Sequence, residues 1–91
     1  MNAQRRDTNE PEIVAALRGA GAYVIFMDRM AGFDLLVTFQ GTSHIVEVKM
    51  PGKEKALKPR EETRRFEVIT YGEALYNIVT TPGEALRVIG R

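Results

Sequence analysis

Three ionisable side chains near the ends of two predicted strands have types and spacing that suit chemistry on a phosphate. Asp34 lies near the start of a predicted strand over 33–39, and Glu47 and Lys49 lie on a second predicted strand over 44–49. Because side chains alternate between the two faces of a strand, Glu47 and Lys49 point the same way. Two carboxylates and an ammonium on one face can bind a divalent cation beside a phosphate group.

A predicted hairpin brings these groups together. The loop over 40–43 contains a glycine and has the length of a hairpin connection. If Phe39 pairs with His44, the antiparallel register places Leu36 opposite Glu47, and Asp34 opposite Lys49. The reverse face then carries an apolar set suited to packing on a helix, namely Phe33, Leu35, Val37, Phe39, Val46 and Val48. One face is therefore predicted to pack in the core while the other presents the charges.

The predicted metal is Mg²⁺ or Mn²⁺, since such ions favour oxygen ligands. Asp34, Glu47 and the backbone carbonyl of Val48 are the expected ligands. Lys49 is expected to orient a water molecule and to offset charge that develops on the phosphate. No histidine is required for this chemistry.

A glutamate on the first predicted helix is expected to complete the site. Asn9 is a predicted N-cap with Glu12 at the third helical position, and the helix reaches about residue 20. At 100° per residue, Glu10 projects with Val14 and Leu17 toward the interior, whereas Glu12 points nearly the opposite way. Glu10 is therefore predicted to ligate the metal or a water, and Glu12 to cap the helix.

The remaining elements define an α/β domain. A mostly buried strand is predicted over 22–27, a polar loop over 50–58, a helix from Pro59 to about residue 70, a strand over 74–79 and a short helix capped by Thr81. Phe66 and Ile69 are expected to face inward from the second helix. The order α-β-β-β-α-β-α, with a crossover helix before the last strand, favours a mixed sheet flanked by helices. One domain over 9–91 is expected after a flexible, solvated tail over 1–8 that includes Arg5 and Arg6.

Composition narrows the possible classes of protein. The chain has 91 residues, 44% of them hydrophobic, with a net charge of +1 and no cysteine. Disulfides and thiolate metal sites are thereby excluded, and a reducing cytoplasm suits the chain. The longest apolar run, 22–27, is far shorter than the roughly 20 residues of a membrane span, so neither membrane anchor nor signal peptide is predicted.

Basic residues concentrate in one segment that suits contacts with DNA phosphates. Seven of the 13 lie between positions 49 and 65. Those assigned to DNA binding are Lys53, Lys55, Lys58, Arg60 and Arg64. Glu54, Glu61 and Glu62 lie in the same segment, so a solvated surface with salt bridges is the alternative.

These motifs together resemble the PD-(D/E)xK nucleases, and within them the small VRR-NUC and Holliday-junction-resolvase-like proteins of phages. The resemblance rests on Glu10 in the first helix, on Gly32-Phe33-Asp34-Leu35-Leu36-Val37, and on Val46-Glu47-Val48-Lys49. It implies a restriction-endonuclease-like core and a metal-dependent nuclease, with Glu10, Asp34, Glu47 and Lys49 as the expected catalytic residues. It further implies branched, Holliday-junction-like DNA as substrate, a homodimer, and the host cytoplasm as location if the protein is encoded by a phage.

Two departures from the family pattern stand out. Phe33 occupies the position where the family has proline before the aspartate. The family also supplies a glutamine from its second helix, whereas here Pro59 is followed by Arg60-Glu61-Glu62-Thr63, and the residue that fills this role stays open. Three alternatives to an independent nuclease also remain: a surface ion pair without function, a DNA-binding module that does not cut, and a nuclease that needs a partner protein to choose its substrate.

Overall fold

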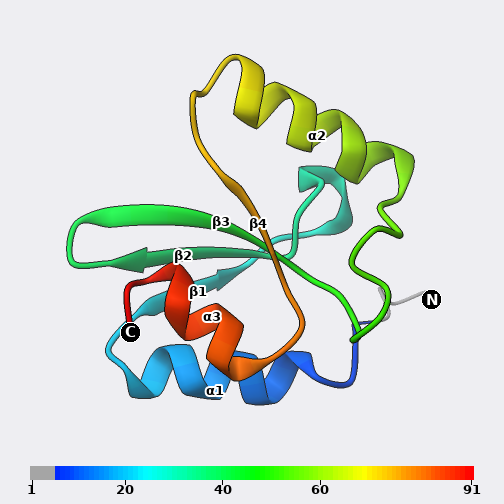
Figure 1. Ribbon diagram of the computed structural model, residues 1–91. Helices are drawn as coiled ribbons and strands as arrows, with labels where there is room; N and C mark the ends of the chain where they lie inside the picture. The colour runs from blue at the N-terminus through cyan, green and yellow to red at the C-terminus, as the bar shows by residue number, and fades with distance from the viewer. Residues whose placement is uncertain (1–5) are drawn as a thin grey trace.

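The computed structural model describes residues 6–91 and contains the predicted order of elements (Figure 1). The elements are α1 (Glu10–Gly19), β1 (Tyr23–Phe26), a short 3₁₀ helix η1 (Arg29–Ala31), β2 (Leu35–Phe39), β3 (Thr42–Val48), α2 (Pro59–Thr70), β4 (Tyr76–Val79) and α3 (Pro82–Val88). The α/β class and the order α-β-β-β-α-β-α are thereby confirmed. No helix within residues 6–91 is long and apolar enough to cross a membrane.

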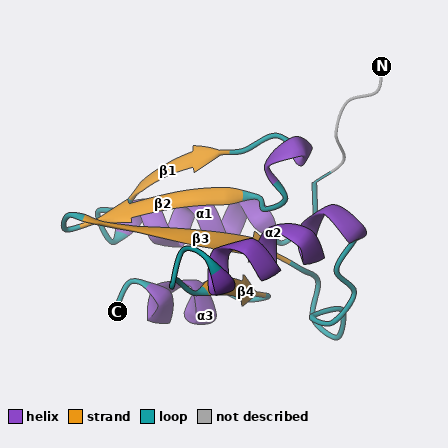
Figure 2. Cartoon of the chain, turned by 90° about the horizontal axis from the view of Figure 1, so that it is seen from above, coloured by secondary structure: helices purple, strands orange, loops and turns teal. Residues whose placement is uncertain are grey.

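The four strands form one mixed sheet in the order β1-β2-β3-β4. The first three strands are antiparallel, and β4 runs parallel to β3 after the crossover through α2. A parallel neighbour requires such a crossover, so the predicted mixed sheet is confirmed. Helices α1 and α3 lie against one face of the sheet, and α2 lies on the other side (Figures 1 and 2).

The register of the β2–β3 hairpin differs from the predicted one. Phe39 pairs with Thr42, not with His44, and Leu35 pairs with Val46. The turn consists of Gln40 and Gly41, both with positive φ (50° and 84°), which is the two-residue turn that matches the twist of a hairpin. A hydroxyl contact of 3.1 Å between Thr38 and Ser43 extends the pairing close to this turn. The four-residue loop was wrong because Thr42 and Ser43 belong to the strand.

The two-residue shift leaves the faces unchanged, because side chains alternate with a period of two. Leu35, Val37, Val46 and Val48 are all buried under α1, as the apolar reverse face predicted. On the helix side, the core includes Ile13 and Leu17 of α1. The opposite face of the hairpin carries the charged residues Asp34, Glu47 and Lys49.

Four local predictions were wrong. Strand β1 is mostly exposed, since only Val24 of its four residues is buried; it is an edge strand that packs one face only. Phe66 and Ile69 are 59% and 45% exposed, because α2 turns Glu61, Arg64 and Val68 inward instead.

The other two corrections concern the start of the chain. Asn9 makes no side-chain cap to α1; its Nδ2 donates to the carbonyls of Lys49 (3.0 Å) and Thr80 (2.8 Å), which joins α1 to the ends of β3 and β4. Arg6 is not a solvated tail residue, because it forms ion pairs with buried Glu10 and half-buried Asp34. Arg5 lies outside the described residues. By contrast, Thr81 caps α3 as predicted, accepting from the Glu84 amide at 3.1 Å.

Candidate active site

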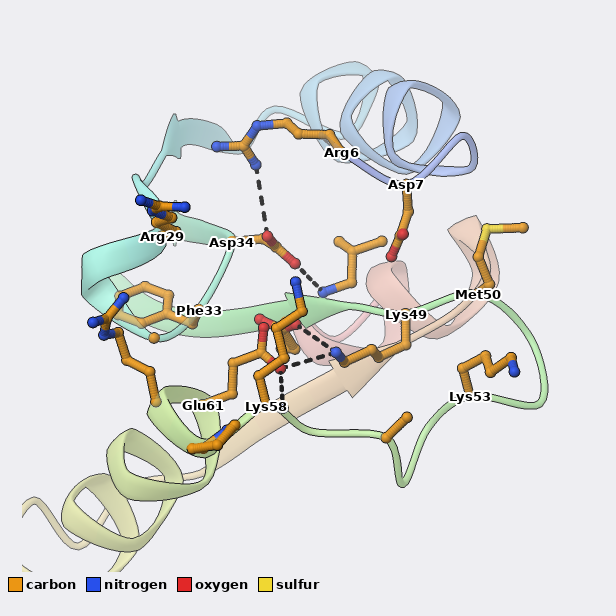
Figure 3. Close-up of a pocket in the computed structure, with 16 residues that line it drawn as sticks. Arg6, Asp7, Arg29, Phe33, Asp34, Lys49, Met50, Lys53, Lys58 and Glu61 are labelled. Atoms are coloured by element: carbon orange, nitrogen blue, oxygen red, sulfur yellow. Dashed lines mark hydrogen bonds and ion pairs between the residues drawn. The ribbon is translucent and has the colours of Figure 1, made fainter. Parts of the chain in front are cut away.

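Asp34 is held in place by hydrogen bonds to β3 (Figure 3). Its amide donates to the Val46 carbonyl at 3.2 Å, and its Oδ2 accepts from the Val48 amide at 2.8 Å. These two bonds flank Glu47, so Asp34 lies beside Glu47 and not opposite Lys49 as predicted. Burial raises the pKa of Asp34, while the Val48 amide and the Arg6 charge act in the opposite direction.

Glu47 is the most deeply buried acid at this site. It is 2% exposed, and its Oε1 has no hydrogen-bond partner among the described residues. Burial, and then the negative charges of Asp34 and Glu61, raise the pKa of Glu47 to about 9. A buried carboxylate with one oxygen left without a donor is costly to keep ionised, and a cation beside that oxygen would reduce the cost.

Lys49 lies on the same face as Glu47, as predicted, and its ammonium links two acids. Its Nζ is 3.4 Å from Glu47 Oε2 and 2.9 Å from Glu61 Oε1. Burial lowers the pKa of Lys49, but the hydrogen bond and charge of Glu61, with the charge of Glu47, outweigh it and raise the pKa overall. Lys49 is therefore a fixed cation at neutral pH.

Glu61 contacts Lys49 from α2, the helix whose contribution to the site the sequence left open. Besides holding Lys49, its Oε1 accepts from the Lys58 amide at 2.9 Å, so one carboxylate both caps the start of α2 and places the lysine. Burial opposes ionisation, but the bonds from Lys49 and Lys58 prevail and lower the pKa of Glu61. The available signal was a Glu at the third position of a helix that begins with Pro59, which is a helix-start pattern.

Glu10 is buried, as its helical position predicted, but it does not line the cavity over the site. It is 4% exposed, and burial raises its pKa despite the nearby Arg6. The Arg6 guanidinium stands between Glu10 and Asp34, since Nη1 is 2.9 Å from Glu10 Oε2 and 3.7 Å from Asp34 Oδ1. Glu10 and Asp34 are therefore bridged by the Arg6 guanidinium.

Fewer side chains are placed to bind a metal ion than the sequence suggested. Within residues 6–91, no three acid or imidazole side chains gather into a group that could hold a metal ion. Asp34 and Glu47 still fit a divalent cation, because both are carboxylates and Glu47 Oε1 lacks a partner. The backbone amide and carbonyl of one strand residue point toward the same neighbouring strand. Because the Val48 amide bonds to Asp34, the Val48 carbonyl, the third expected oxygen, also points to the Asp34 side of β3.

A cavity of about 760 Å³ opens over these groups, with basic side chains on its walls (Figure 3). Of the residues assigned to DNA binding, Lys53, Lys58 and Arg60 line it, and Arg6 and Arg29 add two cations that were not predicted. Lys55 is exposed but is not part of the cavity wall. Arg64 instead joins α2 to η1, since its Nε donates to the Ala31 carbonyl at 2.7 Å.

The turn before Asp34 is built around Gly32. This residue has φ of 77°, and a Cβ added to it would lie 2.7 Å from Arg64 Cβ and 2.9 Å from the Arg60 carbonyl oxygen. Its own carbonyl accepts from the buried Tyr76 hydroxyl at 2.6 Å. Glycine here lets α2 approach the segment that carries Asp34.

Replacing Gly32 by alanine is expected to lower the free energy of unfolding by about 2 to 4 kcal/mol, which combines an unfavourable φ with overpacking against α2. Gly41→Ala is the matched control, because Gly41 has φ of 84° but nothing within 4 Å of its added Cβ. It should cost about 1 kcal/mol, from conformation alone. Urea unfolding of both variants measures the difference; equal losses would show that close packing at Gly32 has no energetic weight.

No protein-family model, curated protein or solved structure matches the chain.

Proposed function

We propose that this protein is a divalent-metal-dependent nuclease that hydrolyses phosphodiesters in DNA. The observation that carries the proposal is the convergence of Asp34, Glu47 and Lys49 on one cavity with basic walls. Acids alone would repel a nucleic acid, and basic residues alone would only bind it. Their combination supports both a cation site and an adjoining place for the phosphate backbone.

In this proposal Asp34 and Glu47 hold Mg²⁺ or Mn²⁺, with the Val48 carbonyl as a third oxygen. When bound, such an ion lowers the pKa of a coordinated water and polarises a phosphoryl oxygen. The Val48 amide keeps Asp34 oriented through its bond to Oδ2, so the aspartate is positioned before any ligand arrives.

Lys49 would stabilise the negative charge that develops on the phosphate during attack by water. Its ammonium is fixed by Glu47 and Glu61 at 3.4 and 2.9 Å, so little reorganisation is needed. Glu10 lies outside the Asp34–Glu47 pair, because the Arg6 guanidinium stands between Glu10 and Asp34. Lys53, Lys58 and Arg60 would contact the flanking phosphates.

The finer assignment follows the resemblance to PD-(D/E)xK nucleases. The helix order and the mixed sheet are consistent with a restriction-endonuclease-like core. On that basis we propose branched DNA as the substrate, a homodimer as the active form, and the cytoplasm as the location. Glu61 would take the place of the glutamine that the family supplies from its second helix.

A DNA-binding module that does not cut is the second candidate. The observation in its favour is that no group of three ligating side chains forms within residues 6–91. Such a module would bind DNA through the same basic walls but would show no cleavage with any divalent cation.

Cleavage of labelled DNA separates the two candidates. Four-way junction, flap, linear duplex and single-stranded DNA would be incubated with Mg²⁺, Mn²⁺ or EDTA, using the wild type and Asp34→Asn. A nuclease requires cutting that depends on metal and is lost in Asp34→Asn, and the junction should be cut fastest. Binding without cleavage under every condition would overturn the nuclease proposal in favour of the binding module.

A further inference from the structure

Arg6 lies between Glu10 of α1 and Asp34, the residue just before β2. Its Nη1 contacts both Glu10 Oε2 (2.9 Å) and Asp34 Oδ1 (3.7 Å). Its Nη2 donates to the Met27 carbonyl at 2.6 Å, and its guanidinium carbon lies 5.2 Å from the centre of the Phe26 ring. Two contacts outside the acids therefore fix this guanidinium in place.

The position of Arg6 bears directly on cation binding. Asp34 Oδ2 is already used by the Val48 amide, so Oδ1 is the oxygen of Asp34 that faces Arg6. A divalent ion on Asp34 would meet a positive charge held a few ångströms away on the same carboxylate. Like charges at such a distance repel strongly in a partly buried site.

We infer that Arg6 is a built-in counter-ion of the Glu10–Asp34 pair, which stabilises the metal-free protein and competes with the divalent cation for Asp34. Arg6 thereby sets the metal concentration at which the site fills. This inference rests on the proposed metal site and adds its regulation by a residue of the same chain. Competition of this kind is reciprocal. The free energy by which Arg6 stabilises the metal-free protein is subtracted from the free energy of metal binding.

Replacing Arg6 by glutamine is expected to tighten Mg²⁺ and Mn²⁺ binding by on the order of tenfold, because one positive charge leaves the site. Binding would be measured by titration calorimetry with MgCl₂ or MnCl₂ at constant ionic strength and without DNA, so the readout is independent of cleavage. The metal-free variant should also unfold at lower urea concentration than the wild type, since Glu10 and Asp34 lose their counter-ion.

Arg18→Gln is the matched control. Arg18 also stacks on Phe26, at 5.5 Å, but no ion pair joins it to an acid of the site among the described contacts. Its removal should leave metal affinity within about twofold of the wild type. Arg6→Lys keeps the charge and should behave like the wild type, which distinguishes loss of charge from loss of packing.

Two results would overturn the inference, and only the second of them is also a failure of the proposed metal site. Equal or weaker metal binding by Arg6→Gln, with clear binding by the wild type, would show that Arg6 organises the site and does not compete. If no metal binds to any variant, the metal site falls and the inference with it. Should Arg6→Gln not fold, Arg6→Met keeps an apolar stem over Phe26 and carries the same expectation.

Discussion

Replacing Lys49 by methionine is expected to slow DNA cleavage by roughly 100- to 1000-fold, the usual cost of removing a positioned donor that stabilises transition-state charge. The ammonium of Lys49 is the cation nearest Glu47, at 3.4 Å, and Glu61 holds it at 2.9 Å. Single-turnover rates with excess protein and saturating Mg²⁺ measure this effect, because substrate binding then no longer limits the rate.

Lys53→Met is the matched control for Lys49→Met. Lys53 lines the same cavity but is exposed and outside the Glu47–Lys49–Glu61 cluster. Its loss should weaken DNA binding and reduce the salt dependence of binding, while the single-turnover rate stays within a few-fold of the wild type. A rate for Lys49→Met equal to that of Lys53→Met would remove Lys49 from the chemistry.

Lys49 also contacts two acids, so its loss could act through stability alone. The double variant Lys49→Met with Glu61→Gln removes one of the acids left unpaired and should recover part of the lost stability. Its cleavage rate should remain as low as that of Lys49→Met. Recovery of rate together with stability would assign Lys49 a structural role only.

The charged face of the hairpin could be predicted because it depends on the parity of the strands. The register was wrong by two residues, yet Asp34 and Glu47 remain on one face, since a shift of two preserves alternation. The turn itself could not be predicted in the same way. Gln40 adopts a positive φ that its residue type disfavours, and the pairing of Thr42 and Ser43 stabilises it only once both strands are formed.

Helical phase predicted the burial of Glu10, but the spacing of four residues from Arg6 did not predict that the same arginine also contacts Asp34. Arg6 reaches Glu10, Asp34 and the Met27 carbonyl at once, and these groups come together only when α1 packs on the sheet. Glu61 was missed for the same reason, because its bond to Lys49 depends on how α2 docks. The inward prediction for Phe66 and Ile69 failed because hydrophobicity does not tell which side of α2 meets the rest of the chain.

The free energy of unfolding of the metal-free protein is expected to fall as pH rises, because Glu47 ionises less readily in the folded protein. The pKa of Glu47 is about 9 in the folded protein, whereas its ordinary value is 4.5. Between these values the unfolded chain releases the Glu47 proton and the folded protein keeps it, so ionisation favours the unfolded chain. The contribution of Glu47 to stability is therefore fully present below about pH 4.5 and is lost as pH rises through about pH 9.

Glu47→Gln removes this titration, and the variant is expected to gain stability relative to the wild type as pH rises across that window. Urea unfolding in EDTA from pH 5 to pH 9 measures the difference. Asp34, Glu61 and Glu84 also have shifted pKa values, but they are present in both proteins, so the difference reports mainly on Glu47.

Glu84→Gln provides a control of opposite sign. Bonds from the Thr80 amide and hydroxyl to Glu84 Oε1, at 2.6 and 2.9 Å, lower the pKa of Glu84. Its contribution to stability is present above its ordinary value of 4.5 and is lost as pH falls through the lowered value, so Glu84→Gln should be less stable than the wild type at neutral pH. A Glu47→Gln difference that is flat with pH, beside a normal Glu84 response, would mean that Glu47 is ionised in the folded protein. The Lys49 ammonium, 3.4 Å from Glu47 Oε2, would then be the charge that keeps this carboxylate ionised without added metal.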